Sequence, residues 1–198
     1  RISPHFTFNV LGREINQFNG SEEVKHNLME LVKYLRRSLE LTEKLSVSLQ
    51  DELDFVRTYI ELERGRVGEE FIATVTVEDG LDATRIMIPS MIVQIPVENA
   101  IKHGLAGKDG KKELMVYVSR ETNGIRITVT DNGRGYLPQV VSATRGTGTG
   151  LKVLYQTIQL LNTKNKSDKI RFNITNRSDG QTGTEVSVYI PFRFSYDL

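Results

Sequence analysis

The chain has 198 residues, with 26 Lys and Arg against 25 Asp and Glu, and contains no cysteine or tryptophan. Hydrophobic residues at 38% and charged residues at 26% are typical of a folded globular chain and exclude a disordered one. The net charge of +1 gives no electrostatic reason to expect a nucleic acid partner, and the lack of cysteine excludes disulfides, thiolate metal sites and a cysteine nucleophile.

The N-terminal part of the chain is predicted to form two helices, separated by a break at Asn19-Gly20. The first helix has an apolar face and, beside it, a polar stripe formed by His5, Asn9, Gly12 and Asn16. The second begins at Ser21, a good N-cap, and its apolar stripe is formed by Val24, Leu28, Leu31 and Leu35. Two helices with narrow apolar stripes cannot bury a sound core alone, so we expect a dimeric four-helix bundle.

The rest of the chain mixes helical and alternating patterns. A third helix is predicted from its cap at Ser48 to Gly65 and Gly68. Strands are predicted at 71–78, 85–88, 114–118, 125–129, 169–175 and 185–190, and further helices at 91–103 and 151–161. Pro96 should kink the first of these helices or lie in its first turn. This pattern predicts the α+β class, with helices on one face of a mixed sheet.

The end of the 91–103 helix holds the first cluster of reactive side chains. Asn99 and Lys102 are three residues apart and share a helix face, and His103 lies beside them, four residues from Asn99. An amide, an ammonium and an imidazole on one turn could hold a metal-bound polyphosphate. The alternative is an ordinary helix end, with cations in the last turn and Gly104 as the C-cap.

A second segment follows the strand that ends near Val129. Asp131 has the parity of the buried residues of that strand, so it should point to the helix-covered face. A carboxylate there is costly unless it accepts hydrogen bonds, and an exocyclic amine such as that of adenine is a suitable donor. Gly133 and Gly135 would let the backbone approach a ligand closely. The alternative is a tight turn, which Asp-Asn-Gly forms readily.

Two further glycine-containing segments come later in the chain. Residues 146–151 form a glycine-rich run that opens a helix, whose free N–H groups suit phosphate. This run is not a Walker A loop, because no Lys-Ser/Thr pair follows its last glycine. Gly183-Thr184 precedes the final strand.

In this order, the four segments resemble the Bergerat-type ATP-binding fold of the gyrase, Hsp90, histidine kinase and MutL superfamily. The resemblance implies ATP and Mg²⁺ as cofactors, with Asn99 as the Mg²⁺ ligand, Lys102 and His103 on phosphate, and Asp131 on the adenine amine. Residues 136–149 would be the ATP lid. The other nucleotide-binding residues that the resemblance implies are Gly133, Gly135, Gly148, Gly150, Leu151 and Thr184.

The N-terminal residues Pro4-His5-Phe6-Thr7-Phe8-Asn9 resemble the Pro-His-Phe-x-Phe-Asn signature of LytS-like sensor histidine kinases. Residues 49–66 resemble the connecting helix of that family, and residues 89–104 resemble its asparagine box. The resemblance implies that His5 is the phosphoacceptor. It also implies two domains, with the dimerisation and phosphoacceptor helices in 1–48 and the connecting helix and ATP-binding domain in 49–198.

The implied activity is that of an autophosphorylating protein-histidine kinase of a two-component system, which transfers the γ-phosphoryl group of ATP to His5. The phosphoryl group then passes to an aspartate on the receiver domain of a response regulator, usually of the LytTR type in this family. Glu98, next to Asn99, is the candidate general base. Since the chain begins at Arg1 and not at Met, we expect it to be a piece of a longer protein. The use of ATP implies the cytoplasmic side, and the resemblance implies a sensor anchored in the inner membrane.

Two alternatives stay open from the sequence. An ATP-hydrolysing clamp of the Hsp90 or MutL type places a water-activating glutamate four residues before the asparagine, where this chain has Ile95. A non-catalytic nucleotide-binding module would fit three departures from the family pattern. These are Val153 in place of Asn, Thr157-Ile158 in place of Arg-Leu, and Pro96, which stands one place later than the family's proline.

Overall fold

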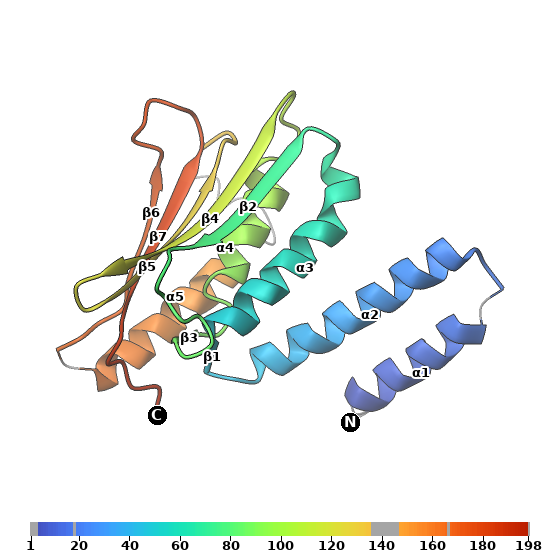
Figure 1. Cartoon of the computed structure of the whole chain (residues 1–198), viewed down its shortest axis with the longest axis horizontal. Helices are drawn as coiled ribbons and strands as arrows, with labels where there is room; N and C mark the ends of the chain where they lie inside the picture. The colour runs from blue at the N-terminus through green and yellow to red at the C-terminus, as the bar shows by residue number, and fades with distance from the viewer. Residues whose placement is uncertain (1–3, 18, 136–146, 166, 198) are drawn as a thin grey trace. The chain divides into compact units, whose positions relative to one another are not determined.

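The computed structural model describes residues 4–17, 19–135, 147–165 and 167–197, and of residues 4–7 and 147–149 it describes the backbone alone. The chain divides into two compact units, Arg1–Lys44 and Leu45–Leu198, which we describe separately (Figure 1). We expected the first domain to run to residue 48. In the structure, strand β1 (Ser46–Ser48) pairs antiparallel with β3 (Met87–Pro89), so these residues belong to the second unit.

The first unit is a hairpin of two helices, α1 (Pro4–Gln17) and α2 (Glu22–Thr42), as the sequence predicts. The Ser21 side chain caps α2 by accepting a hydrogen bond from the Val24 N–H at 3.3 Å. The two helices are linked by the Arg36 guanidinium, which donates to Asn9 Oδ1 at 3.1 Å.

The predicted apolar stripe of α2 is open to solvent in the single chain. Val24, Leu31 and Leu35 are each at least 40% exposed, and Leu28 is half-buried. Leu39, one turn beyond Leu35, is exposed as well. Exposed apolar side chains at helical spacing along one face form a surface that another helix could cover.

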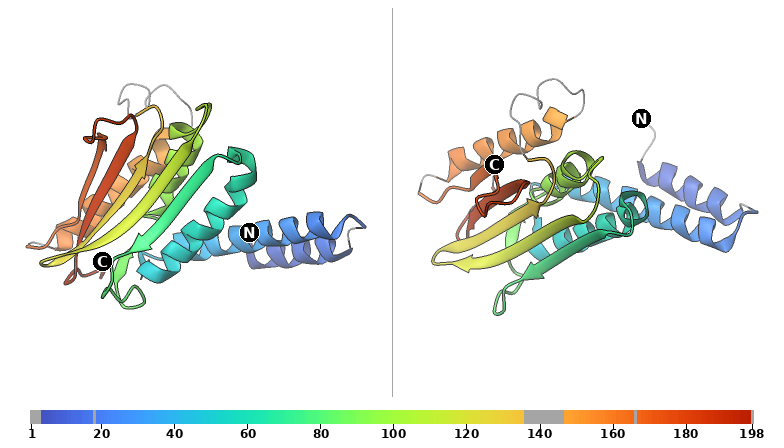
Figure 2. Two further views of the ribbon diagram at one scale, coloured as in Figure 1. Left: turned by 45° about the horizontal axis from the view of Figure 1, so that its top comes forward. Right: turned by 90° about the horizontal axis from the view of Figure 1, so that it is seen from above.

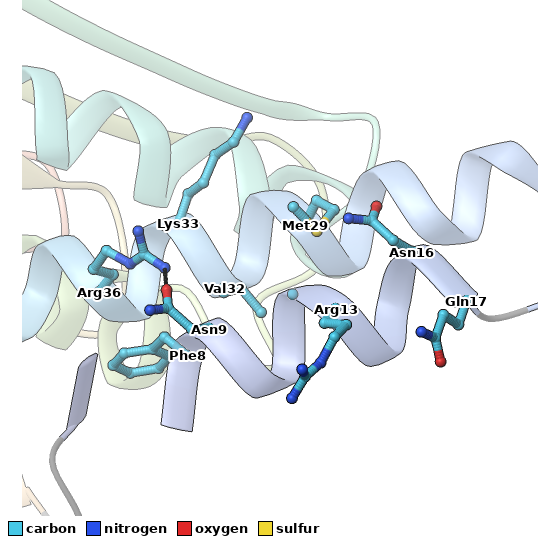
Figure 3. Close-up of a pocket in the computed structure, with 10 residues that line it drawn as sticks. Phe8, Asn9, Arg13, Asn16, Gln17, Met29, Val32, Lys33 and Arg36 are labelled. Carbon is cyan, nitrogen blue, oxygen red and sulfur yellow. Dashed lines mark hydrogen bonds between the residues drawn. The ribbon is translucent and has the colours of Figure 1, made fainter. Parts of the chain in front are cut away.

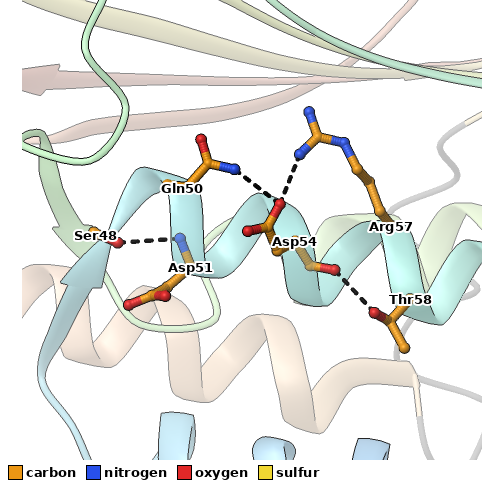
Figure 4. A network of polar contacts seen from close by, with 6 residues as sticks. All are labelled: Ser48, Gln50, Asp51, Asp54, Arg57 and Thr58. Carbon is orange, nitrogen blue, oxygen red and sulfur yellow. Dashed lines mark hydrogen bonds and ion pairs between the residues drawn. The ribbon is translucent and has the colours of Figure 1, made fainter. Parts of the chain in front are cut away.

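The second unit opens with α3 (Leu49–Val67). The predicted cap is confirmed, because the Ser48 hydroxyl accepts a hydrogen bond from the Asp51 N–H at 3.1 Å (Figure 4). The solvent face of α3 is polar, and there Asp54 accepts hydrogen bonds from Gln50 at 2.8 Å and from Arg57 at 3.0 Å. The opposite face packs into the core through Leu49, Leu53, Val56 and Ile60.

The second unit contains a five-stranded mixed sheet in the order β2-β4-β5-β7-β6. Its strands are β2 (Phe71–Val77), β4 (Lys112–Glu121), β5 (Gly124–Asp131), β7 (Thr184–Pro191) and β6 (Arg171–Asn176). Strand β2 runs parallel to β4, and the other neighbours are antiparallel. Helices α3, α4 (Gln94–Asn99) and α5 (Thr147–Lys164) lie on one face of the sheet (Figures 1 and 2). The predicted α+β architecture is confirmed.

The strands show which face of the sheet is covered. In β4, Val116 and Val118 are fully buried, whereas Met115 is 48% exposed and Tyr117 is 38% exposed. This alternation is expected for a sheet with a core on one side and solvent on the other. No helix of the described residues is long and apolar enough to cross a bilayer.

One predicted helix differs from the structure. We expected a helix over 91–103, but α4 begins at Gln94, because Met91 has a φ of 67° and the chain turns there. Pro96 lies in the first turn, where a missing N–H leaves no intrahelical bond unmade. From Ala100 to Gly104 the helix continues as a π-helical turn, η1, in which the Leu105 N–H donates to the Ala100 carbonyl at 2.8 Å.

Candidate functional site

Asp131 is the last residue of β5 and only 4% of it is exposed. Its position on the helix-covered face agrees with the parity argument from the sequence. The Gly133 N–H donates to its Oδ1 at 2.8 Å. A buried carboxylate of this kind is stabilised by hydrogen bonds, and a ligand amine would add to them.

Burial has a measurable consequence for Asp131. It raises the pKa of the carboxyl above the ordinary value of 3.8. The backbone N–H groups of Gly133 and Thr184 and the charge of Arg177 lower the pKa, but with smaller effect. Thr184 is the first residue of β7 and is half-buried. Since its backbone N–H bonds the Asp131 carboxylate, these two sequence-predicted residues lie together.

Three glycines allow three separate segments to meet around Asp131. A Cβ on Gly133 would lie 2.1 Å from the Gly104 carbonyl oxygen, and a Cβ on Gly183 would lie 1.9 Å from the Asp131 carbonyl oxygen. A Cβ on Gly104 would lie 2.9 Å from Asp131 Oδ1. Gly104 and Gly183 lie in segments that the sequence analysis singles out, but their role at Asp131 was missed, because it depends on contacts between segments far apart in the chain.

The turn after β5 joins the sheet to the end of η1. The Arg134 N–H donates to the Gly104 carbonyl at 3.3 Å, and the Arg134 guanidinium donates to the Ala106 carbonyl at 2.7 Å. On the other side, Asn132 Oδ1 accepts from the Glu113 N–H of β4 at 2.8 Å. The second sequence-predicted glycine, Gly135, has a φ of 88°, which glycine adopts without strain. These contacts bring the asparagine-bearing helix next to Asp131.

The side chains of α4 form a linked row. Glu98 accepts hydrogen bonds from Gln94 Nε2 at 3.1 Å and from Lys102 Nζ at 3.3 Å. Asn99 Nδ2 is buried and, within the described part of the chain, has no hydrogen-bond partner. A buried amide without a partner in the protein is the feature expected where a polar ligand completes the bonding.

The π-helical turn changes the predicted relation among Asn99, Lys102 and His103. We placed Asn99 and Lys102 on one face from α-helical spacing, but a π turn is wider, so this spacing rule does not carry across it. The Lys102 ammonium donates a hydrogen bond to the Glu98 carboxylate. Burial, followed by the charges of Lys102 and Arg134, lowers the pKa of His103, which favours its neutral form.

The other predicted nucleotide contacts lie at the start of α5. Gly148 is in its first turn, Leu151 is half-buried, and a Cβ on Gly150 would lie 3.5 Å from Ile95 Cγ2, in ordinary contact with α4. Residues 136–146 of the predicted lid lie outside the described residues.

Few side chains of the site could serve as ligands for Mg²⁺. Among the described residues, no group of three or more His, Asp or Glu side chains lies close enough to hold a metal ion. Mg²⁺ usually keeps several waters and binds one or two protein groups together with substrate phosphates. Asn99 offers one amide oxygen, the kind of single protein ligand that such an ion takes, whereas its unpartnered amide nitrogen is a donor suited to a ligand oxygen.

In the first unit, His5 lies in the first turn of α1 and its side chain is outside the described residues. Asn9 follows one helical turn later. A groove of about 510 Å³ between α1 and α2 is lined in part by Asn9 and by three cations, Arg13, Lys33 and Arg36 (Figure 3). His26 is exposed on α2, as expected for a solvated helix residue.

Comparison with known protein families gives two matches. Residues 1–71 match the family model described as "Histidine kinase". Residues 85–193 match the model described as "Histidine kinase-, DNA gyrase B-, and HSP90-like ATPase". The first match covers the His5 helix and the second covers Asn99, Asp131 and the glycines around them.

Curated relatives show the same likeness over most of the chain. The sensor histidine kinase/phosphatase LytS of Staphylococcus aureus (strain MRSA252) is 32% identical over 191 residues, covering 92% of this chain and 32% of the relative. The sensor histidine kinase YpdA of Escherichia coli (strain K12) is 28% identical over 192 residues, covering 96% and 33%. The chain thus spans about a third of the length of these relatives.

Solved structures share the fold. The histidine kinase domain of the blue-light activated kinase EL346 from Erythrobacter litoralis aligns with a TM-score of 0.55 at 18% identity, covering 94% of this chain and 82% of the other. The Acinetobacter baumannii histidine kinase AdeS aligns with a TM-score of 0.50 at 15% identity, covering 96% of each.

Proposed function

Because this chain belongs to the histidine kinase family, we propose that it binds ATP, transfers the γ-phosphoryl group to His5, and then passes it to an aspartate of a response regulator. The observation that carries the proposal is the buried Asp131 carboxylate, enclosed by glycine-containing segments and held by backbone donors. It supplies an acceptor for the adenine amine, and the first unit supplies the phosphoacceptor.

The transfer step needs one nucleophile and one leaving group. A lone pair of a neutral His5 imidazole nitrogen attacks the γ-phosphorus, the bond to the β,γ-bridging oxygen breaks, and ADP leaves with that electron pair. The other ring nitrogen then loses its proton. Glu98 is our candidate acceptor for it. Its bonds to Gln94 and Lys102 orient the carboxylate.

Asn99 would hold Mg²⁺ through its amide oxygen, and Lys102 and His103 would contact phosphate. When bound, Mg²⁺ neutralises charge on the phosphate oxygens. This assignment rests on the resemblance of the segment around Asn99 to the family's asparagine box, within the ATPase-like family match.

Replacing Asn99 by alanine is expected to remove the dependence of nucleotide binding on Mg²⁺, because the amide oxygen is the proposed protein ligand. Calorimetric titration of ADP with and without Mg²⁺ measures this dependence in parent and variant. An equal response to Mg²⁺ in the two proteins would contradict the metal role of Asn99.

We also propose that the first unit forms a homodimer. The exposed apolar stripe of α2, from Val24 to Leu39, would be covered by the same stripe of a second copy, as in a four-helix bundle.

The family resemblance suggests that the response regulator is of the LytTR type. ATP as the substrate places this part of the protein on the cytoplasmic side of a membrane-anchored sensor.

The test of the proposed function is incubation with Mg²⁺ and γ-labelled ATP. A histidine kinase retains label that is stable to base and lost in acid. Bound nucleotide without label would support the non-catalytic module, for which Val153 on α5 is one of the departures from the family pattern. Steady ATP hydrolysis without a phosphoprotein would support the clamp, although Ile95 provides no water-activating carboxylate there.

A further inference from the structure

Glu52 is a fully buried carboxylate outside the predicted site. It lies on the core face of α3 and has no exposed surface. Burial raises the pKa of its carboxyl, and three backbone N–H groups lower it with smaller effect. A buried carboxylate compensated by backbone donors alone is costly, so its position calls for a structural explanation.

All three donors belong to the turn that starts α4. Oε2 accepts from the Met91 N–H at 2.8 Å, and Oε1 accepts from the Val93 N–H at 2.6 Å and the Gln94 N–H at 3.2 Å. The N-cap residue of α4 is Val93, which makes no side-chain capping bond. Glu52 therefore performs from α3 the capping that α4 lacks in its own sequence.

The turn that Glu52 holds is conformationally unfavourable. Met91 has a φ of 67°, and a residue with a Cβ adopts this region at a cost. The hydrogen bond from Met91 to Glu52 helps to hold that conformation. Since α4 has only six residues, its start and direction depend on such external contacts.

The constraint extends from the cap to the predicted phosphate end of the site. Asn99 lies about 7–8 Å further along the helix axis than Gln94. Gln94, whose N–H binds Glu52, donates through its side chain to Glu98, and Glu98 also binds Lys102. A shift of the first turn would therefore move Asn99 and Lys102. Asp131 is anchored by its own strand, β5, and by the Gly133 N–H, and it meets the helix at Gly104, the far end of η1 from the Glu52 cap.

We infer that Glu52 is a positioning residue for the metal-phosphate end of the nucleotide site, acting through the first turn of α4 on Asn99 and Lys102. This inference rests on the proposed nucleotide binding. It predicts that loss of the Glu52 carboxylate weakens contacts to the phosphates and Mg²⁺ and leaves the adenine end at Asp131 intact.

The test compares adenosine, which has no phosphate, with Mg·ADP by NMR titration of the parent and Glu52→Gln. We expect the dissociation constant of Mg·ADP to rise at least fivefold and that of adenosine to change less than twofold. The matched control is Asp54→Asn, which removes an exposed carboxylate of the same helix and should change neither constant.

Equal weakening of both ligands would show a general structural role, and no change would show that the cap is dispensable. Either result overturns the inference. If Glu52→Gln does not fold, Glu52→Asp, which keeps the charge but shortens the side chain, should give the same selective loss. A parent that binds neither ligand would instead refute the proposed function, so the two failures are distinguishable.

Discussion

Replacing His5 by alanine is expected to leave no base-stable phosphoryl group on the protein after incubation with γ-labelled ATP. The variant removes the only nucleophile that we propose for the transfer. His5 lies in the first unit, whereas Asn99 and Asp131 lie in the second. Nucleotide affinity should therefore be the same in variant and parent.

The matched control is His26→Ala. His26 is an exposed histidine of the same helical hairpin, so its loss should leave the label unchanged. Label that survives in His5→Ala would refute the phosphoacceptor assignment. Loss of label in both variants would point to damage to the hairpin, which circular dichroism would reveal.

Replacing Asp131 by asparagine is expected to weaken ADP binding at least tenfold, or ~1.4 kcal/mol. The asparagine NH₂ group must face either the Gly133 N–H or the adenine amine, both of which are donors. The variant thus removes a charge-assisted bond and adds a donor-donor conflict. Calorimetric titration of ADP measures the change, and equal affinity in the two proteins would refute the adenine assignment.

The raised pKa of Asp131 adds a pH test. As the pH falls towards this pKa, the carboxylate gains a proton and accepts fewer hydrogen bonds, so ADP affinity should fall in the parent. The difference in affinity between the parent and Asp131→Asn should shrink in the same range, above the ordinary aspartate value of 3.8.

Stability responds to the pH in the opposite direction from ADP affinity. The folded-state pKa of Asp131 lies above the unfolded one, so its contribution to the free energy of unfolding is full below the unfolded value and is lost as pH rises through the folded value. Affinity and thermal stability should therefore move in opposite directions with pH on account of this group. A parent-variant difference in affinity that is flat with pH would contradict the prediction.

Much of the fold could be predicted because its signals are local. The alternation in β4 and β5 identifies their buried residues, and the caps at Ser21 and Ser48 are single side chains next to the helices they start. The burial of Asp131 follows from strand parity alone. These predictions need no knowledge of what lies across the sheet.

The rest of the site depends on contacts between distant segments. The start of α4 is set by Glu52 on another helix, and the meeting of Gly104 with Gly133 requires the helix end and the strand end to be adjacent. The π-helical turn at Ala100 has no local sequence signal that we could identify. Periodicity analysis assumes regular helices, so it placed Asn99 and Lys102 on a common face.

The solvent face of the five-stranded sheet makes the protein convenient for spectroscopy. Thr74 and Thr76 of β2 are exposed there, and they pair with Met115 and Tyr117 of the solvent face of β4. Since the chain contains no cysteine, one cysteine introduced at either position would be the only thiol, without prior removal of native ones. A second cysteine on the exposed side of α2 would provide a pair for distance measurements. The proposed transfer to His5 requires the second unit to approach the His5 helix, and this pair of probes would follow that approach without touching either proposed site.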